Sequence, residues 1–249
     1  MEKAIRIILL IIAMGVMSFS GYKLLCIYSE YAVGDKIYDD YVEKYTVETV
    51  DTVETVENLE EEEFSFSIDF NGLLAENEDV VGWIYSEDTP INYPIVQSED
   101  NKHYLRRLLD GSYNIAGSIF MDYKNPHDFT DFNTIIYGHN LRNGAMFSTL
   151  KEYNNQEYYE KHPTMYLFAP QAKYLIQLIA GYQTDIYSNI YTLPETEEEL
   201  ELLYEEIIGL SRFEANTIYE KGDRLLTLST CSDGGDTARY VLIGKIVEE

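Results

Sequence analysis

Most of the chain after Phe64 is made of short apolar runs that are separated by turn residues. Examples are "INYPIVQ", "GSIFMDY", "NTIIYGHN", "TMYLFAP", "DRLLTLSTC" and "RYVLIGKIV". Many short β-type runs at modest spacing are typical of a β-barrel or a β-sandwich. With 249 residues, 45% of them hydrophobic, the chain is long enough to bury a sizeable core. The sequence therefore predicts a mostly β fold for this part of the chain.

Three helices are expected among these runs. The clearest is "TEEELELLYEEIIGL", in which apolar residues recur at helical spacing and Thr196 with Glu199 predicts a capping box. Its apolar stripe consists of Leu200, Leu203, Tyr204, Ile207 and Ile208. A second helix is expected over residues 145–162, with an inward face formed by Phe147, Leu150 and Tyr153. A short helix is expected before a strand at Val80–Tyr85.

The first residues combine an apolar run with preceding basic side chains. Sixteen uncharged residues extend over positions 7–22, after Lys3 and Arg6. A helix that spans a membrane needs about 20 residues, and continuation to Tyr28 supplies them. The positive charges favour a cytoplasmic N-terminus, with the rest of the chain outside. A cleaved signal peptide is the alternative, but no clear A-x-A site follows. We therefore expect a retained membrane anchor over residues 1–28.

The next segment, residues 29–63, is strongly acidic. It carries thirteen Asp and Glu residues against two Lys residues, and it repeats "TVETV" before a run of four Glu. Like charges repel and little apolar surface is available to bury, so a solvated extracytoplasmic spacer is expected, with a short helix near Tyr31–Tyr45. The whole chain has a net charge of −26. This charge argues against a nucleic-acid partner, because binding of phosphates needs clustered Lys and Arg.

The two cysteines are poorly placed to form a disulfide. Cys26 lies in or beside the expected membrane segment, and Cys231 lies near the other end of the chain. In an exported protein, cysteines are usually paired, so a lone thiol indicates a reactive residue. A buried and inert Cys231 is the alternative, although the residues after it form a polar loop.

Cys231 and Arg239 end and begin two β-type runs that are joined by residues 232–238. If these runs pair as antiparallel neighbours, the thiol and the guanidinium lie at the same end of the sheet. Such a guanidinium can stabilise a thiolate or an oxyanion. A nucleophilic Cys also needs a proton-transfer partner. His139 ends the apolar run "NTIIYGHN" at a strand terminus, whereas solvated positions are expected for His103, His127 and His162.

These motifs resemble the sortase signature, and the match is closest to class B sortases. The sequences "NYPIVQ", "GSIFMDY", "YGHN…MFSTL" and "TLSTC" occur in the family's order, followed by Arg239. The helix near residues 195–210 lies where class B enzymes carry an inserted helix before the cysteine strand. The resemblance implies a closed eight-stranded β-barrel with N-terminal helices, covering residues 64–249.

The resemblance also implies a cysteine transpeptidase. Cys231 would cleave a C-terminal sorting motif of a secreted protein after Thr and form a thioester. Arg239 would hold the oxyanion, and His139 would transfer protons. An amine of the cell-wall precursor would then take the acyl group. The family implies no cofactor and no metal, and the sequence offers no cluster of metal ligands.

Four further residues are carried over as contacts for the sorting motif. They are Asn92 in "NYPIVQ", Ser229 in "TLSTC", and Ile190 and Tyr191 in the loop before the inserted helix. Two other functions stay open at this level. One is an anchored cysteine peptidase that only hydrolyses, and the other is a catalytically silent surface-binding module with a buried Cys231.

Overall fold

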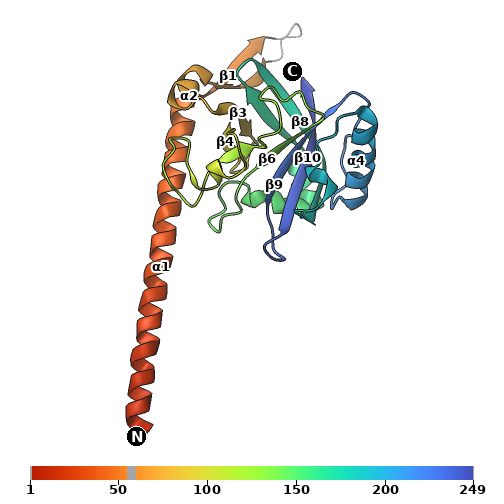
Figure 1. The fold of residues 1–249 in the computed structure, drawn as a ribbon. Helices are drawn as coiled ribbons and strands as arrows, with labels where there is room; N and C mark the ends of the chain where they lie inside the picture. Colours follow the sequence, from red (N-terminus) through yellow and green to blue (C-terminus); the bar gives the residue numbers. More distant parts are fainter. Residues whose placement is uncertain (1, 55–59, 249) are drawn as a thin grey trace.

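The computed structural model describes residues 2–54 and 60–248, and its central feature is a closed β-barrel. Eight strands close in the order β10-β8-β7-β3-β4-β5-β6-β9, and Figure 1 shows helices arranged around them. The strands are β3 (Val80–Tyr85), β4 (Asn92–Val96), β5 (Ile119–Met121), β6 (Asn133–Tyr137), β7 (Thr164–Ala169), β8 (Ala172–Asp185), β9 (Arg224–Cys231) and β10 (Ala238–Glu248). Of the two β architectures compatible with the apolar runs, the barrel is therefore confirmed.

Two pairings in the barrel are parallel, β4 with β5 and β6 with β9, and the others are antiparallel. Parallel neighbours need a long connection between them. For β6 and β9, that connection contains β7, β8 and α4 (Glu197–Leu210). The topology therefore brings two strands together that are far apart in the sequence.

Strands β8 and β10 are apolar on both faces because both faces are covered. One face contributes Leu178, Tyr240 and Leu242 to the main core of the barrel. The other contributes Ile179, Val241 and Ile243 to a second cluster under α4. Each fully buried aliphatic side chain of this kind stabilises the fold by roughly 1.5–3 kcal/mol. This two-sided burial explains why "RYVLIGKIV" shows no alternation of polar and apolar residues.

Helix α4 begins and packs largely as expected. The Thr196 side chain caps it by accepting a hydrogen bond from the Glu199 amide at 3.3 Å. The Glu199 carboxylate accepts from the Glu195 amide, one residue before the position of an ideal capping box. Leu200, Leu203 and Ile207 are buried, whereas Ile208 at the edge of the stripe is 41% exposed.

The helix expected over residues 145–162 is two shorter helices in the structure. The 3-10 helix η2 spans Ser148–Asn154, and α3 spans Gln156–Lys161. Between them, Asn155 has an extended backbone and its side chain accepts a hydrogen bond from the Glu157 amide. An Asn in this role starts a new helix rather than continuing the previous one. The expected inward residues Phe147, Leu150 and Tyr153 are all fully buried.

Helix α1 is longer than expected, and its two halves have different surroundings. It spans Glu2–Tyr45, with an exposed apolar first half that Figure 1 shows projecting away from the barrel. Among the described residues, one helix, Lys3–Tyr45, is long and apolar enough to cross a membrane. Near its end, Tyr38, Tyr41 and Tyr45 are buried in the main core.

The expectation of a solvated spacer therefore does not describe the first half of residues 29–63. The tyrosines that are buried there recur at helical spacing and form one apolar face of the helix. The prediction of a solvated spacer was based on the number of acidic residues and did not take this face into account. Strands β1 (Thr46–Glu54) and β2 (Glu60–Ile68) follow as an antiparallel pair outside the barrel, and residues 55–59 lie outside the described part. The short helix α2 (Phe70–Glu76) then leads into β3, as expected.

Candidate active site

Cys231 and Arg239 are directly opposite each other in the antiparallel pair of β9 and β10. Residues that are paired in this way project to the same face, with their Cβ atoms about 4.5–5.5 Å apart. The thiol is exposed, and the guanidinium is half-buried. Beyond the pair, the Ser232 amide donates to the Ala238 carbonyl at 3.1 Å and the strands separate into a polar loop. The predicted proximity of Cys231 and Arg239 is thus confirmed.

His139 reaches the same end of the barrel through the parallel pairing of β6 with β9. Tyr137 lies opposite Ser229, and the Gly138 amide continues the ladder by donating to the Ser229 carbonyl at 3.1 Å. Two residues further along both strands, the chain arrives at His139 and Cys231. The Asn140 side chain secures this end by donating to the Cys231 carbonyl at 2.8 Å.

The His139 imidazole is half-buried and is hydrogen-bonded to a backbone carbonyl. Its Nε2 lies 2.7 Å from the Leu105 carbonyl oxygen, which can only accept, so Nε2 carries a proton. Burial lowers the pKa of His139, the Arg106 charge lowers it further, and the Leu105 contact opposes both. With Nε2 engaged, Nδ1 is the ring nitrogen that is left to gain or lose a proton.

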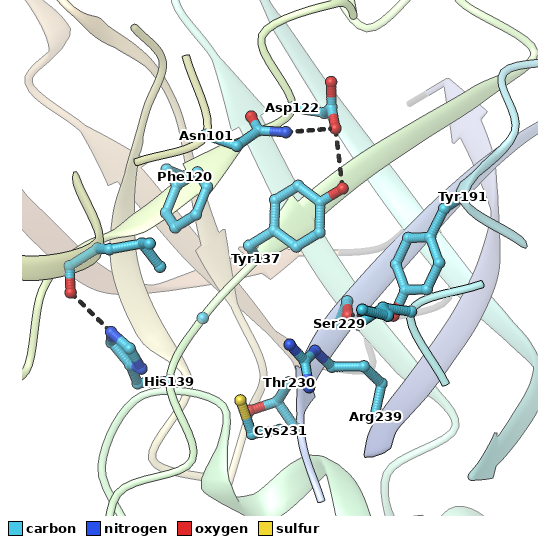
Figure 2. Close-up of a pocket in the computed structure, with 13 residues that line it drawn as sticks. Asn101, Phe120, Asp122, Tyr137, His139, Tyr191, Ser229, Thr230, Cys231 and Arg239 are labelled. Atoms are coloured by element: carbon cyan, nitrogen blue, oxygen red, sulfur yellow. Dashed lines mark hydrogen bonds between the residues drawn. The ribbon is translucent and has the colours of Figure 1, made fainter. Parts of the chain in front are cut away.

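The Arg239 guanidinium is partly held by the backbone of its own loop. Its Nη1 donates to the carbonyls of Asp236 at 3.0 Å and Ala238 at 2.8 Å. In Figure 2 the guanidinium lies between Tyr137 and Cys231. A guanidinium carries five N–H donors, so this arrangement leaves donors for a charged oxygen beside the sulfur.

These three residues line one pocket of about 400 Å³ at the mouth of the barrel. The pocket combines the charged and nucleophilic groups with apolar and aromatic walls, as ligand sites usually do. Its lining comprises Asn101, Leu105, Phe120, Asp122, Tyr137, Gly138, His139, Ile186, Tyr191, Ser229, Thr230, Cys231 and Arg239. Within the described residues, no group of three or more His, Cys, Asp or Glu side chains is placed to hold a metal ion.

Two of the four expected motif contacts line this pocket. Tyr191 and Ser229 do so, and their hydroxyl oxygens are hydrogen-bonded at 2.7 Å. Ile190 does not, because its side chain is buried in the cluster under α4. Its carbonyl instead accepts a hydrogen bond from the buried Asn133 side chain at 3.1 Å, which anchors the 3-10 helix η3 (Asn189–Tyr191). Ile190 thus supports the wall of the pocket from behind.

Asn92 is also absent from the lining of this pocket. Its side-chain oxygen accepts a hydrogen bond from the Trp83 indole at 2.7 Å, and the residue borders a different pocket beside α1. Asn101 lines the pocket of Cys231 instead. It follows β4, in the loop that crosses over to the parallel strand β5. In the sequence, Asn101 is marked only as a polar residue in the connection between two strands, which does not distinguish it from other loop residues.

Asp122 and Tyr137 are two further pocket residues that the sequence analysis missed. The Asp122 carboxylate accepts hydrogen bonds from the Asn101 amide and the Tyr137 hydroxyl, both at 2.8 Å (Figure 2). Both residues lie in motifs that the sequence analysis used, "GSIFMDY" and "NTIIYGHN", but as parts of strands. Because both motifs were interpreted as strands, the polar side chains in them were not considered as pocket residues.

An exposed thiol, an imidazole and a guanidinium at one barrel mouth match a known family. A model of the sortase domain matches residues 84–247. The chain belongs to the sortase family. Sortase B of Listeria monocytogenes is 35% identical over 96% of this chain and 95% of its own length. Sortase B of Staphylococcus aureus is 34% identical over 72% of this chain and 75% of its own length.

Solved structures agree with this assignment. The crystal structure of sortase B from B. anthracis in complex with AAEK1 has a TM-score of 0.74 and 31% identity, over 90% of this sortase and all of that chain. The Staphylococcus aureus sortase B–substrate complex has a TM-score of 0.68 and 34% identity, over 72% of this sortase and 84% of that chain. This sortase is therefore a class B enzyme and a cysteine transpeptidase of the family that anchors proteins to the cell wall. A silent module with a buried Cys231 does not fit, because the thiol is exposed.

Proposed function

We propose that this sortase cleaves a C-terminal sorting motif of a secreted protein after Thr and joins the new C-terminus to an amine of the cell-wall precursor. The observation that carries the proposal is the convergence of Cys231, His139 and Arg239 on one pocket. His139 and Cys231 are 92 residues apart in the sequence, and the parallel pairing of β6 with β9 brings them to the same end of the barrel.

In the first half of the reaction, the Cys231 thiolate attacks the Thr carbonyl carbon. The carbonyl oxygen becomes an oxyanion, which the free N–H groups of Arg239 stabilise. The carbon–nitrogen bond then breaks, and protonated His139 gives its proton to the departing amine. The products are a thioester on Cys231 and the released C-terminal peptide.

In the second half, the acceptor amine attacks the thioester carbon. Neutral His139 takes the proton from this amine, and Arg239 again holds the oxyanion. The carbon–sulfur bond breaks, which restores the thiolate and leaves a new amide bond. The lowered pKa of His139 suits this half, because the imidazole is then largely neutral at pH 7 and able to accept a proton.

The domain plan follows from the same proposal. Residues 1–28 form the membrane anchor with the N-terminus inside, and the catalytic domain lies on the extracytoplasmic face. The exposed apolar half of α1 supports this plan, as does its position beyond the docked tyrosines. Labelling of single cysteines introduced before and after the span, in a Cys26→Ala, Cys231→Ala background in intact cells, tests it. Labelling of a residue 2 variant but not a residue 64 variant from outside would contradict the topology.

A peptide library tests the reaction itself. Peptides with varied residues before Thr-Gly are incubated with the enzyme, with and without a triglycine acceptor. We expect cleavage after Thr, a Cys231-linked acyl-enzyme in the mass spectrum, and ligated product only with the acceptor. Cys231→Ala removes both cleavage and acyl-enzyme, with a loss of at least about 10³-fold in rate. Hydrolysis alone, at a rate that the acceptor does not change, would favour the hydrolytic peptidase.

A further inference from the structure

Asp122 is a buried carboxylate in the wall of the active-site pocket. It follows β5 directly, it is 7% exposed, and its backbone is held by the Ile135 carbonyl and the Gln97 side chain. Its three side-chain partners are neutral groups: the Asn101 amide and the Tyr137 hydroxyl at 2.8 Å, and the Lys124 backbone amide at 3.0 Å. Among the described residues Asp122 forms no ion pair, so hydrogen bonds from these three groups compensate its burial and fix the positions of the donors.

The hydrogen bonds of Asp122 orient two side chains of the pocket. Asn101 is held at both ends of its amide, because Nδ2 donates to Asp122 and Oδ1 accepts from the Tyr123 amide at 3.0 Å. Tyr137 is fixed through its hydroxyl, and its ring is stacked on Tyr191 at a centroid distance of 6.4 Å. Asp122 therefore determines the direction of one amide and one aromatic ring in the pocket.

Figure 2 places this cluster on the side of Tyr137 that faces away from Cys231 and Arg239. The residues N-terminal to the scissile bond stay attached in the thioester, and the pocket beyond the sulfur offers a place for them. The pocket then has a cation, Arg239, near the scissile carbonyl and an anion, Asp122, near the preceding residues.

We propose that Asp122 is a positioning residue that orients Asn101 and Tyr137 around the peptide segment preceding Thr, and that its charge selects against acidic side chains there. This proposal rests on the function proposed above. The carboxylate touches the peptide's neighbours rather than the reacting atoms, so it governs binding of the peptide more than the chemical steps.

The experiment compares Asp122→Asn with the full-length wild type on matched peptides. The peptides differ only by Gln or Glu at each of the three positions before Thr. At the position nearest Asp122, we expect the wild type to prefer Gln over Glu by about tenfold or more in kcat/KM. The reason is that Asp122 repels a second carboxylate in a pocket that is partly shielded from water. In Asp122→Asn, KM for the neutral peptide rises several-fold, kcat stays within about twofold, and the penalty for Glu shrinks.

Two further variants show whether the effect runs through the named contacts. Asp128→Asn is the matched control, since Asp128 is an exposed residue of the same loop whose carboxylate caps the turn at Thr130. It leaves KM and the preference unchanged. Tyr137→Phe raises KM, and the double variant with Asp122→Asn is less than additive, because both remove the same hydrogen bond.

A fall in kcat with unchanged KM, or a penalty for Glu that is equal in wild type and Asp122→Asn, overturns the proposal. Wild-type cleavage that depends on Cys231 serves as the reference, so failure of the function proposed above shows first as absence of that cleavage. Circular dichroism and the rate of Cys231 alkylation report folding of each variant. If Asp122→Asn does not fold, Asn101→Ala and Tyr137→Phe take its place, and unchanged KM in both overturns the proposal.

Discussion

The two sides of the active site are held in place by different kinds of structure. Cys231 and Arg239 lie on adjacent strands, and eight paired positions between β9 and β10 fix their register. His139 lies just after β6, where the ladder with β9 ends at Gly138, and the segment beyond it has only an isolated bridge of Asn140 with Met146 and a hydrogen bond from the Phe147 amide to the His139 carbonyl at 3.0 Å. Its imidazole depends on the Leu105 carbonyl, which belongs to the 3-10 helix η1 (His103–Arg106) at the start of an irregular connection to β5.

That connection is in turn supported by the end of α1. The Tyr38 hydroxyl donates to the Gly117 carbonyl at 2.9 Å and lies 2.8 Å from the Ser118 hydroxyl. Asp35 accepts a hydrogen bond from Asn143, in the loop after His139, at 2.8 Å. The histidine side of the site thus rests on loops and on the same helix that we propose enters the membrane. The comparison teaches that a continuous strand pairing holds Cys231 and Arg239 together, whereas the position of His139 depends on distant packing.

The largest effect is expected when the histidine itself is removed. His139→Ala should lower the turnover number by about 10²–10⁴-fold, because proton transfer to and from the amine is lost. Alkylation of Cys231 by a thiol reagent should persist, since the β9–β10 unit is untouched. Rates of peptide ligation and alkylation measured on the same variant check this. Turnover close to that of wild type would exclude His139 as the proton-transfer group.

A substitution in the β9–β10 pair comes next. Arg239→Lys should reduce kcat by about 10²–10³-fold, because lysine lacks the fork that bonds the loop carbonyls and an oxyanion at once. The thermal midpoint should change little, since the residue is at a strand end. Steady-state kinetics and a thermal melt decide the matter. A variant with nearly normal kcat would reduce Arg239 to a structural role and break the proposed unit of nucleophile and oxyanion donor.

The support of the histidine side is probed by a pair of glycines. Gly117 has φ +60, and a Cβ there would lie 2.6 Å from the Leu105 carbonyl oxygen, whereas Gly111 has φ +79 with open space around it. Gly117→Ala should lower stability by about 1–3 kcal/mol and reduce kcat, because it displaces the acceptor of His139. Gly111→Ala should lower stability by about 1 kcal/mol and leave kcat unchanged. Equal kcat in the two variants would show that His139 does not depend on this connection.

The smallest effect concerns the charge beside the histidine. Arg106 contributes to the lowered pKa of His139, after burial. Arg106→Gln should therefore raise this pKa slightly, because the removed charge is exposed and screened. The protonated fraction at pH 7 rises accordingly. An NMR titration of the His139 ring signals checks the shift, with Arg107→Gln as the neighbouring control. A downward shift in Arg106→Gln would contradict the assignment.

The parts that could be predicted from the sequence are those in which the determining residues are close along the chain. The pairing of Cys231 with Arg239 follows from two adjacent runs and a short loop, and the cap of α4 follows from Thr196 and the residues after it. The break at Asn155 was missed because the apolar periodicity continues across it. The docked end of α1 was missed because acidic residues on one face obscured buried tyrosines on the other.

The contents of the pocket were harder to predict. Asn92 was expected in it, but the Asn92 side chain is hydrogen-bonded to Trp83 outside this pocket. The asparagine that lines the pocket is Asn101, in the loop between β4 and β5. Ile190 was expected to face the motif, yet it supports the wall from behind. The residues around Asn92 and Ile190 do not indicate these positions. The face of a strand or loop that lines a cavity is determined by elements that are distant in the sequence.

By itself, the sequence determined a β-rich chain with a lone thiol near its C-terminus, an arginine opposite it and an apolar N-terminal helix, since periodicity and short-range pairing depend on residues that are close along the chain. The resemblance of its ordered motifs to a known family indicated the cysteine enzyme. Only the tertiary structure decided that His139 arrives beside Cys231, that Asp122 orients the far end of the pocket, and that α1 supports the histidine side. The physical reason is that these contacts arise from a parallel strand pairing and from side-chain hydrogen bonds between distant segments, whose geometry exists only once the barrel has closed.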